Sequence, residues 1–336
     1  DGWHLYRRYP PRNSENFWTT VWASIFAVCR AHRLRKHKPD VIHGVWATGP
    51  ATAAAILGRL CGVPFSFGGH AYDIYRHGGD AFLEPKLRAA SFVHTTTEAG
   101  LAYLRERSGD ASVNILLARR GLDRLPPKSE RDAAARPIRL LSVGRLVAKK
   151  GHDHQLAACT LLKSWGVPFI AKIVGDGPLR DELQRRINRD GLGGLVIFCG
   201  ALPPKQVQEQ YRWADIFWHT GQVDTEGDRD GLPNVIPEAF AHCLPVITSR
   251  TAGPMEAVAH DTSGLVVDVS NASGLADAVK RLAADPQLRR RLGENGRHWV
   301  EEHFLTAQNT EILARAFREI SGQPSSRPTA IKPTSA

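Results

Sequence analysis

Two carboxylates eight positions apart, Asp230 and Glu238, mark the ends of the segment whose residue types are best suited to binding or catalysis. Pro237 has no N–H group, so it should lie in the first turn of a helix that begins inside this segment. Gly231 and the amides that follow it can face an anion, because unpaired N–H groups and the helix dipole favour negative charge there. Glu238 can accept hydrogen bonds from two adjacent hydroxyls, such as those of a ribose. The segment therefore predicts a phosphate seat next to a sugar clamp.

Two other roles are open for Asp230. It could cap the helix that follows it. Together with Asp228 it also forms an Asp-x-Asp pair that could suggest a divalent cation. Two loop carboxylates are common, however, and Arg229 between them opposes a cation. We therefore expect no metal site and no cofactor.

A basic loop follows a predicted strand at residues 138–143. It carries Gly144, Arg145 and Lys150. A guanidinium fork and a compact ammonium together suit a diphosphate. Two surface cations are the ordinary alternative, but the acidic segment at 230–238 favours a binding role here.

Two glycine-containing turns are less specific. Gly175-Asp176-Gly177 ends a strand but has no third glycine, so it does not support a dehydrogenase fingerprint. It is either a tight turn before a helix or part of a nucleotide pocket. His70 follows two glycines at another strand end, and it is either a structural histidine or a residue of the cleft.

The elements around these residues alternate between strands and helices, which is typical of parallel sheets covered on both faces. In the first part, strands are expected at 41–46, 64–67 and 91–95 and helices at 17–36, 49–60 and 97–107. In the second part, strands are expected at 138–143, 169–174, 196–199, 216–218, 245–248 and 265–267. Helices are expected at 275–303 and 308–320. Ligands of such sheets bind outside the carboxyl ends of the strands, where the loops described above lie.

A proline- and charge-rich stretch at 125–137 indicates a linker between two domains. The predicted organisation is an N-terminal domain at 1–134 and a second domain at 135–305, followed by a helix at 306–320. Residues 321–336 are rich in Pro, Ser and Thr and predict a disordered tail.

The composition limits the classes of ligand that the chain is expected to bind. Lys and Arg outnumber Asp and Glu by ten in 336 residues, which favours anionic ligands. The excess is spread along the chain without interleaved aromatics, so no nucleic acid is expected. The five cysteines lack metal spacing and indicate a cytoplasmic protein.

The helix at 17–36 ends in basic residues and carries Trp18, Trp22 and Phe26. It could lie on the inner face of the cell membrane as a peripheral contact. We prefer the alternative, an ordinary sheet-covering helix with a charged outer face.

Taken in order, the motifs GRLVAKKG, VGDGP, FCGALPP, acid-x7-acid, LPVITS and SGLVVD resemble family 4 glycosyltransferases. The resemblance covers residues 39–304. Residues 41–74 resemble the subgroup that builds bacterial exopolysaccharides, such as colanic-acid-type transferases.

The resemblance implies a GT-B fold, in which two Rossmann-like doubly wound domains face each other across a cleft. It implies that the domain at 1–134 is the acceptor side, that the domain at 135–305 binds the nucleotide sugar, and that the helix at 306–320 crosses back to the first domain. It also implies a retaining transfer of a hexose from a UDP- or GDP-sugar to a saccharide or lipid-linked saccharide, without a metal. His70, Asp230 and Glu238 would be the catalytic residues. The donor-binding residues implied are Gly144, Arg145, Lys150, Gly175, Asp176, Gly177, Gly231, Leu232, Pro233 and Glu238.

The chain departs from the family in two ways. Asp230 stands where the family usually has Glu, which shortens the reach toward the donor sugar. No strand and glycine-rich loop precede Pro39, so we expect the first domain to be incomplete. Two other functions stay open: a nucleotide-sugar epimerase on the same scaffold, and a non-catalytic nucleotide- or saccharide-binding module.

Overall fold

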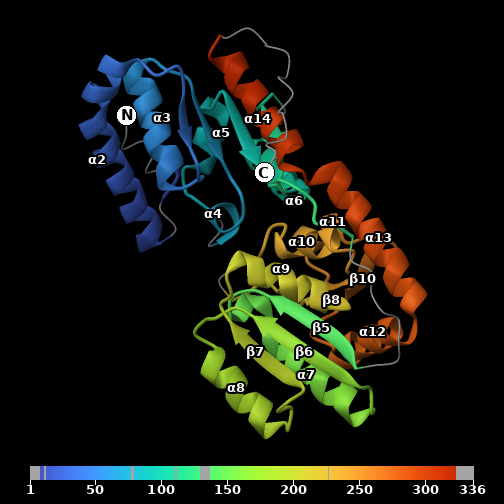
Figure 1. Cartoon of the computed structure of the whole chain (residues 1–336). Coiled ribbons are helices and arrows are strands. Elements are labelled where there is room, and N and C mark those ends of the chain that lie inside the picture. The colour runs from blue at the N-terminus through green and yellow to red at the C-terminus, as the bar shows by residue number, and fades with distance from the viewer. Residues whose placement is uncertain are drawn as a thin grey trace.

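The computed structural model describes residues 8–10, 13–76, 79–109, 112–128, 137–225 and 227–322. They form two parallel sheets with helices around them, each sheet in its own part of the chain (Figure 1). The predicted α/β class is confirmed. Most of the predicted linker and all but two residues of the predicted tail lie outside the described residues.

The first sheet has four parallel strands in chain order: β1 (Ile42–Gly44), β2 (Phe65–Gly68), β3 (Phe92–Thr95) and β4 (Ile115–Leu117). Strand β4 was not predicted, because three residues are too few to show a period. Its carboxyl end lies beside those of the other strands, since Thr95 pairs with Leu117.

Three of the helices described in the first domain correspond to the helices predicted at 17–36, 49–60 and 97–107. The helices described are α2 (Ser14–His37), α3 (Gly49–Cys61), α4 (Tyr72–Tyr75), α5 (Leu83–Ala89) and α6 (Glu98–Ser108). Helix α2 begins at an N-cap, Asn13, whose side chain accepts a hydrogen bond from the amide of Asn16 at 2.8 Å. It packs on α3 through an alanine face, Ala23, Ala27 and Ala31.

The prediction that the outer face of α2 is charged is wrong for its N-terminal half. Trp18 and Trp22 are 55% and 64% exposed on that face. Pattern alone could not separate the two sides of this helix, because the alanines and the aromatics both count as apolar.

The second sheet has six parallel strands in the order β10-β9-β8-β5-β6-β7. Their bounds are β5 (Ile138–Val143), β6 (Phe169–Val174), β7 (Val196–Gly200), β8 (Ile216–His219), β9 (Val246–Ser249) and β10 (Gly264–Val267). Alternate side chains fill a core on each face, as Leu140 and Leu141 belong to different clusters. The strand order reverses between β5 and β8, which creates a crevice at their carboxyl ends.

The helices of the second domain include one correction. They are η2 (Ala148–Lys150), α7 (His152–Ser164), α8 (Arg180–Arg189), α9 (Pro204–Trp213), α10 (Val235–Ala241), α11 (Ala252–Ala257), α12 (Ala272–Ala284) and α13 (Pro286–His303). The single helix predicted at 275–303 is two helices. Asp285 caps the second one by accepting from the amide of Leu288 at 2.9 Å, and Pro286 occupies its first turn.

The last helix, α14 (Thr306–Ile320), lies against the first domain (Figure 1). The Phe317 ring is 5.3 Å from the His43 ring of β1 and 5.1 Å from the Phe92 ring of β3. The C-terminal part of the chain therefore covers the first sheet. A bridge between Leu122 and Leu305 also joins the two parts of the chain.

Candidate active site in the interdomain cleft

The crevice between β5 and β8 brings Lys150 and Asp230 together. The Thr220 hydroxyl, just after β8, lies 3.0 and 2.8 Å from the carbonyl oxygens of Lys150 and Gly151 and so fixes the loop after β5. The aliphatic part of Lys150 lies over Gly144, where a Cβ would be 3.6 Å from Cδ. The Lys150 ammonium then reaches the Asp230 carboxylate at 2.6 Å.

Asp230 has further partners. His219 Nε2 donates to its carboxylate at 3.3 Å, and the Lys149 ammonium is 3.7 Å away. Burial raises the pKa of Asp230, but the His219 hydrogen bond and the Lys150 charge outweigh it and hold the pKa well below its usual range. Asp230 is therefore a carboxylate at neutral pH that occupies a cationic pocket.

The two carboxylates of the Asp-x-Asp pair share a lysine: the Lys149 ammonium is 2.9 Å from Asp228 and 3.7 Å from Asp230. Asp230 also binds Lys150 at 2.6 Å. Arg229, between the two aspartates, lies with its guanidinium 4.1 Å from the centre of the Tyr75 ring, across the cleft. Among the described residues, no group of three or more His, Cys, Asp or Glu side chains is placed to share a metal ion.

Glu238 lies in the first turns of α10, directly after Pro237. The Tyr211 hydroxyl, from α9, donates to the Glu238 carboxylate at 2.8 Å. Burial raises the pKa of Glu238, and the Tyr211 hydrogen bond opposes that rise. The Tyr211 ring is itself held by stacking on His242, with centroids 5.4 Å apart. The Glu238 carboxylate is thus positioned by the buried Tyr211 side chain.

The two glycines of the 175–177 turn are explained by packing. Gly175 has φ +137°, and a Cβ there would lie 1.9 Å from the carbonyl oxygen of Gly144. A Cβ on Gly177 would lie 2.5 Å from the carbonyl oxygen of Leu146. The turn therefore fixes the loop that carries Arg145. The Asp176 side chain is exposed and pairs with Arg180 at 3.6 Å.

Arg145 is exposed, and its carbonyl oxygen accepts a hydrogen bond from His152 Nε2 at 3.2 Å. The backbone of this residue is therefore anchored in the crevice. Its side chain extends toward solvent at the loop where the predicted diphosphate would bind.

In the first domain, Asp73 fixes the loop that carries His70. Its buried carboxylate accepts hydrogen bonds from the amides of His70 at 3.1 Å, Ala71 at 3.0 Å and Ala47 at 2.9 Å. It thereby joins the loops that follow β1 and β2. The buried Asp73 carboxylate, three residues later in the chain, thus fixes the position of His70.

The His70 ring is held by other rings. It meets Trp46 edge-on, with centroids 5.2 Å apart, and lies 5.2 Å from His94. Burial lowers the pKa of His70, so the imidazole is neutral at pH 7. Its Nδ1 is buried and has no hydrogen-bond partner within the described part of the chain. An unsatisfied buried nitrogen of this kind suits a ligand hydroxyl.

The two halves of the predicted site face each other. A Cβ on Gly231 would lie 3.3 Å from Thr97 Cγ2 and 3.7 Å from the carbonyl oxygen of His70. The Asp230–Gly231 loop of the second domain therefore contacts the His70 loop of the first. Leu232 and Pro233 continue from this contact into the start of α10 and are partly and fully buried, respectively.

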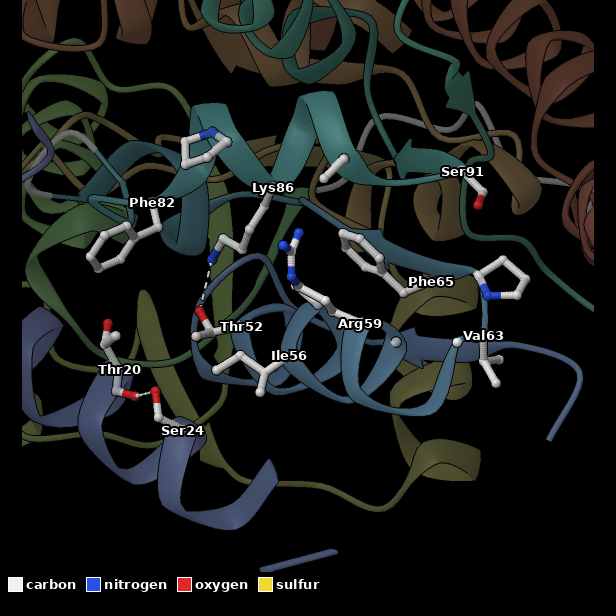
Figure 2. Close-up of a pocket in the computed structure, with 16 residues that line it drawn as sticks. Thr20, Ser24, Thr52, Ile56, Arg59, Val63, Phe65, Phe82, Lys86 and Ser91 are labelled. Carbon is white, nitrogen blue, oxygen red and sulfur yellow. Dashed lines mark hydrogen bonds between the residues drawn. The ribbon is translucent and has the colours of Figure 1, made fainter. Parts of the chain in front are cut away.

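Cavities occur at the cleft and away from it. One of about 290 Å³ lies between the domains and is lined by Tyr75, Tyr103, Asp230 and Gly253 among others. A larger groove of about 910 Å³ lies within the first domain, between α2, α3 and α5 (Figure 2). The larger groove contains none of the predicted site residues.

Several site residues were not predicted. His219 and Lys149 hold Asp230, Tyr211 holds Glu238, and Asp73 holds His70. His219 ends strand β8, so the rule that ligands bind at carboxyl ends of strands could have indicated it. Tyr211 lies in the middle of an amphipathic helix and gives no such signal.

Comparison with known proteins identifies the family of the chain. Residues 128–299 match the family model described as glycosyl transferases group 1. The chain belongs to the group 1 glycosyltransferase family. Residues 2–119 match a second model, the glycosyl transferase 4-like domain. The predicted family is thus confirmed, and with it the class of the enzyme, a transferase.

Curated relatives include the amylovoran biosynthesis glycosyltransferase AmsK of Erwinia amylovora, which is 35% identical over 46% of this chain and 38% of its own length. A second is the GDP-mannose-dependent alpha-(1-6)-phosphatidylinositol monomannoside mannosyltransferase of Mycolicibacterium smegmatis, 32% identical over 50% of this chain and 44% of its own length. The matches therefore span less than half the length of these relatives.

Solved structures share the fold. HepE of Anabaena, in complex with UDP, superposes with a TM-score of 0.72 at 20% identity and covers 87% of this chain and 82% of its own. Sucrose-phosphate synthase of Thermosynechococcus elongatus gives a TM-score of 0.73 at 22% identity and covers 88% of this chain and 77% of its own. The GT-B arrangement of two Rossmann-like domains is confirmed.

Proposed function

We propose that this chain transfers a hexose from a UDP- or GDP-sugar to a saccharide or lipid-linked saccharide during polysaccharide biosynthesis. The observation that carries the proposal is the crevice between β5 and β8, where Lys150 binds Asp230 and the Asp230–Gly231 loop contacts the His70 loop across the cleft. The names of the relatives support the donor class, because HepE was solved with UDP and the mannosyltransferase uses GDP-mannose.

In this proposal the diphosphate binds at Arg145 and Lys150, next to the amides of Gly231 and Leu232. Negative charge grows on the leaving phosphate as the glycosidic bond to it breaks, and fixed cations stabilise that charge. Lys150 is presently paired with Asp230, so the diphosphate would share or replace this carboxylate partner. Two cations and the backbone amides would do the electrostatic work without a metal.

Glu238 would accept hydrogen bonds from both ribose hydroxyls, which requires its ionised form. His70 is neutral and has a free Nδ1, so it would hydrogen-bond a hydroxyl of the transferred sugar. We propose retention of configuration, with the departing phosphate guiding the acceptor to the face it leaves. Closure of the cleft would limit hydrolysis of the donor.

The proposal is tested by replacing Glu238 and Lys150 with Ala, each beside a matched surface control. Glu209→Ala and Lys205→Ala remove exposed side chains of the same kind from α9. Transfer should fall at least a hundredfold in Glu238→Ala and Lys150→Ala and stay unchanged in both controls. Near-normal turnover in both site variants would refute the site.

A thermal-shift panel of UDP, GDP, ADP and CMP identifies the base, because a ligand that binds only the folded state raises the melting temperature. Incubation with the donor alone distinguishes the other functions. An epimerised sugar formed without acceptor would indicate an epimerase, and tight nucleotide binding without any turnover would indicate a binding module.

A further inference from the structure

The cavity of about 290 Å³ between the domains combines two aromatic rings, small residues and a guanidinium. One face of α6 lines this cavity from the first domain. The residues of that face follow the helical spacing i, i+3, i+4 and i+7: Ala99, Ala102, Tyr103 and Glu106. The second domain contributes Arg229, Asp230 and Gly231 and the start of α11. We call this cavity the Arg229 pocket.

The cation of the pocket, Arg229, is held by an aromatic ring. Arg229 is half-buried, and its guanidinium lies over the ring of Tyr75, the last residue of α4, 4.1 Å from the ring centre. Its two acidic neighbours in the chain, Asp228 and Asp230, bind lysines instead. Within the part of the chain that the structure describes, this guanidinium makes no hydrogen bond or ion pair. Its edge is therefore able to donate two parallel hydrogen bonds to a carboxylate.

The other groups of the pocket suit a sugar ring. Tyr75 and Tyr103 meet edge to face with ring centroids 5.1 Å apart, and both are half-buried. Tyrosine combines an apolar ring with a hydroxyl, which suits a ligand that carries C–H groups and hydroxyls side by side. Glu106 is exposed at the end of the α6 face and can accept hydrogen bonds from hydroxyls. Small residues leave space for the ring: Ala99, Ala102, Gly231, Ala252 and Gly253.

The Arg229 pocket adjoins the proposed transfer site. Asp230, whose carboxylate binds Lys150 at 2.6 Å, also lines the pocket. Gly231 lines it too, and a Cβ on Gly231 would lie 3.7 Å from the carbonyl oxygen of His70. The pocket and the transfer site therefore share the Asp230–Gly231 loop. A sugar held in the pocket would belong to the donor or to the acceptor.

A hexuronic acid has the groups that match this lining. Its carboxylate fits the Arg229 guanidinium, its ring fits the two tyrosines, and its hydroxyls can donate to Glu106. A neutral sugar would leave the guanidinium without an acceptor, and a phosphate would leave the tyrosine rings unused. We propose that the Arg229 pocket binds a hexuronic acid through its carboxylate. The role of this sugar in transfer rests on the proposed function, whereas the binding of a free hexuronic acid does not.

The test compares methyl glucuronide with methyl glucoside, which differ only in whether C6 is a carboxylate or a hydroxymethyl group. Isothermal titration calorimetry with the full chain should show at least tenfold tighter binding of the glucuronide, because hydrogen bonds to a charged group are stronger. This preference should decrease at high salt. Equal affinity for the two glycosides would overturn the proposal. So would displacement of the glucuronide by an equal concentration of inorganic phosphate, which would show an anion site without sugar recognition.

Variants locate the binding in the Arg229 pocket. Arg229→Gln should abolish the preference for the glucuronide, and Arg229→Lys, which keeps the charge but not the planar fork, should retain part of it. Ala102→Phe fills the pocket and leaves the guanidinium in place, so it should weaken glucuronide binding at least tenfold. Arg212→Gln removes an exposed arginine of α9 and is the matched control, which should bind normally. Melting temperatures near that of the original chain show that the variants are folded. A preference that persists in Arg229→Gln would refute the assignment.

Nucleotide sugars distinguish the donor from the acceptor as the source of the acidic sugar. If the donor carries it, UDP-glucuronic acid should bind at least tenfold more tightly than UDP-glucose, and Arg229→Gln should remove the difference. If the acceptor carries it, the two nucleotide sugars should bind equally and methyl glucuronide should still bind in the presence of UDP. A chain that binds no nucleoside diphosphate would contradict the proposed function, and the comparison of the two glycosides would still decide the proposal made here.

Discussion

At the scale of single residues, the contact between Tyr211 and Glu238 connects a buried phenol with the predicted ribose clamp. Tyr211→Phe removes the hydrogen bond that opposes the burial-induced rise in the pKa of Glu238. The pKa of Glu238 should therefore rise further, and less of it is ionised at a given pH. A hydrogen bond to a charged group is worth about 1.5–3 kcal/mol, so the KM for donor should increase roughly 10- to 100-fold.

The pH profile of kcat/KM for the donor checks this. Its acidic limb should move to higher pH in Tyr211→Phe, and raising the pH should restore part of the activity. A variant damaged only in its packing would not recover. An unshifted acidic limb would show that Tyr211 does not control Glu238.

Residue types and order identified both partners of the Lys150–Asp230 contact, but only one partner of the contacts with His219 and Tyr211. Asp230, Lys150 and Glu238 were predicted because their loops follow strands or begin helices. Their partners His219 and Tyr211 come from 11 and 27 positions earlier in the chain. Such pairings depend on how the chain folds back around β8, which hydrophobic periodicity does not encode.

At the scale of elements, α11 supports the loop that carries Asp230. A Cβ on Gly253 would lie 1.9 Å from the carbonyl oxygen of Gly231. Gly253→Ala should therefore push the Asp230–Gly231 loop away and reduce transfer at least tenfold. The control is Gly274→Ala in α12, where a Cβ meets only the Asn271 side chain at 3.4 Å or more.

Transfer assays and melting temperatures measure both variants. Gly274→Ala should keep full activity and gain up to about 1 kcal/mol, because Ala favours a helix over Gly. Equal activity of Gly253→Ala and the original chain would mean that the loop position does not matter for transfer.

The bounds of the helices and strands show which local sequence signals predict where an element begins or ends. The bounds of helices α2, α3 and α6 were predicted to within a few residues, because a glycine or a proline follows the end of each apolar pattern. The break between α12 and α13 was missed although Asp285-Pro286 is a cap and first-turn pair. Strand β4 was missed because its position depends on pairing with β3 rather than on its three residues.

At the scale of the whole molecule, one carboxylate joins the two domains. Glu256 of α11 accepts a hydrogen bond from the amide of Glu98 at 2.7 Å, at the start of α6, and pairs with Arg119 at 2.7 Å. An amide at a helix N-terminus and a guanidinium both favour a carboxylate. We call these three residues the Glu256 clamp, and they hold the cleft in the conformation described.

Opening of the clamp should depend on pH. Burial raises the pKa of Glu256 above its ordinary value of 4.5, and Arg119 opposes that rise. Because the closed cleft raises this pKa above that of an open, solvated carboxyl group, the closed state holds the proton more tightly, and it loses relative stability as the pH rises through the raised pKa. The radius of gyration of the ligand-free chain, measured by small-angle X-ray scattering, should therefore be no larger in mildly acidic solution than at pH 7.

Glu256→Gln is neutral at every pH, so this variant should be as compact at pH 7 as the original chain is in mild acid and show no step with pH. Its KM for acceptor should be no higher than that of the original chain, because loss of the charge does not weaken the closed cleft. Arg290→Ala, which breaks an exposed pair with Glu294 on α13, is the control and should scatter like the original chain. A Glu256→Gln variant that expands and has a higher KM would show that this charge, rather than packing around Leu122 and Leu305, keeps the cleft closed.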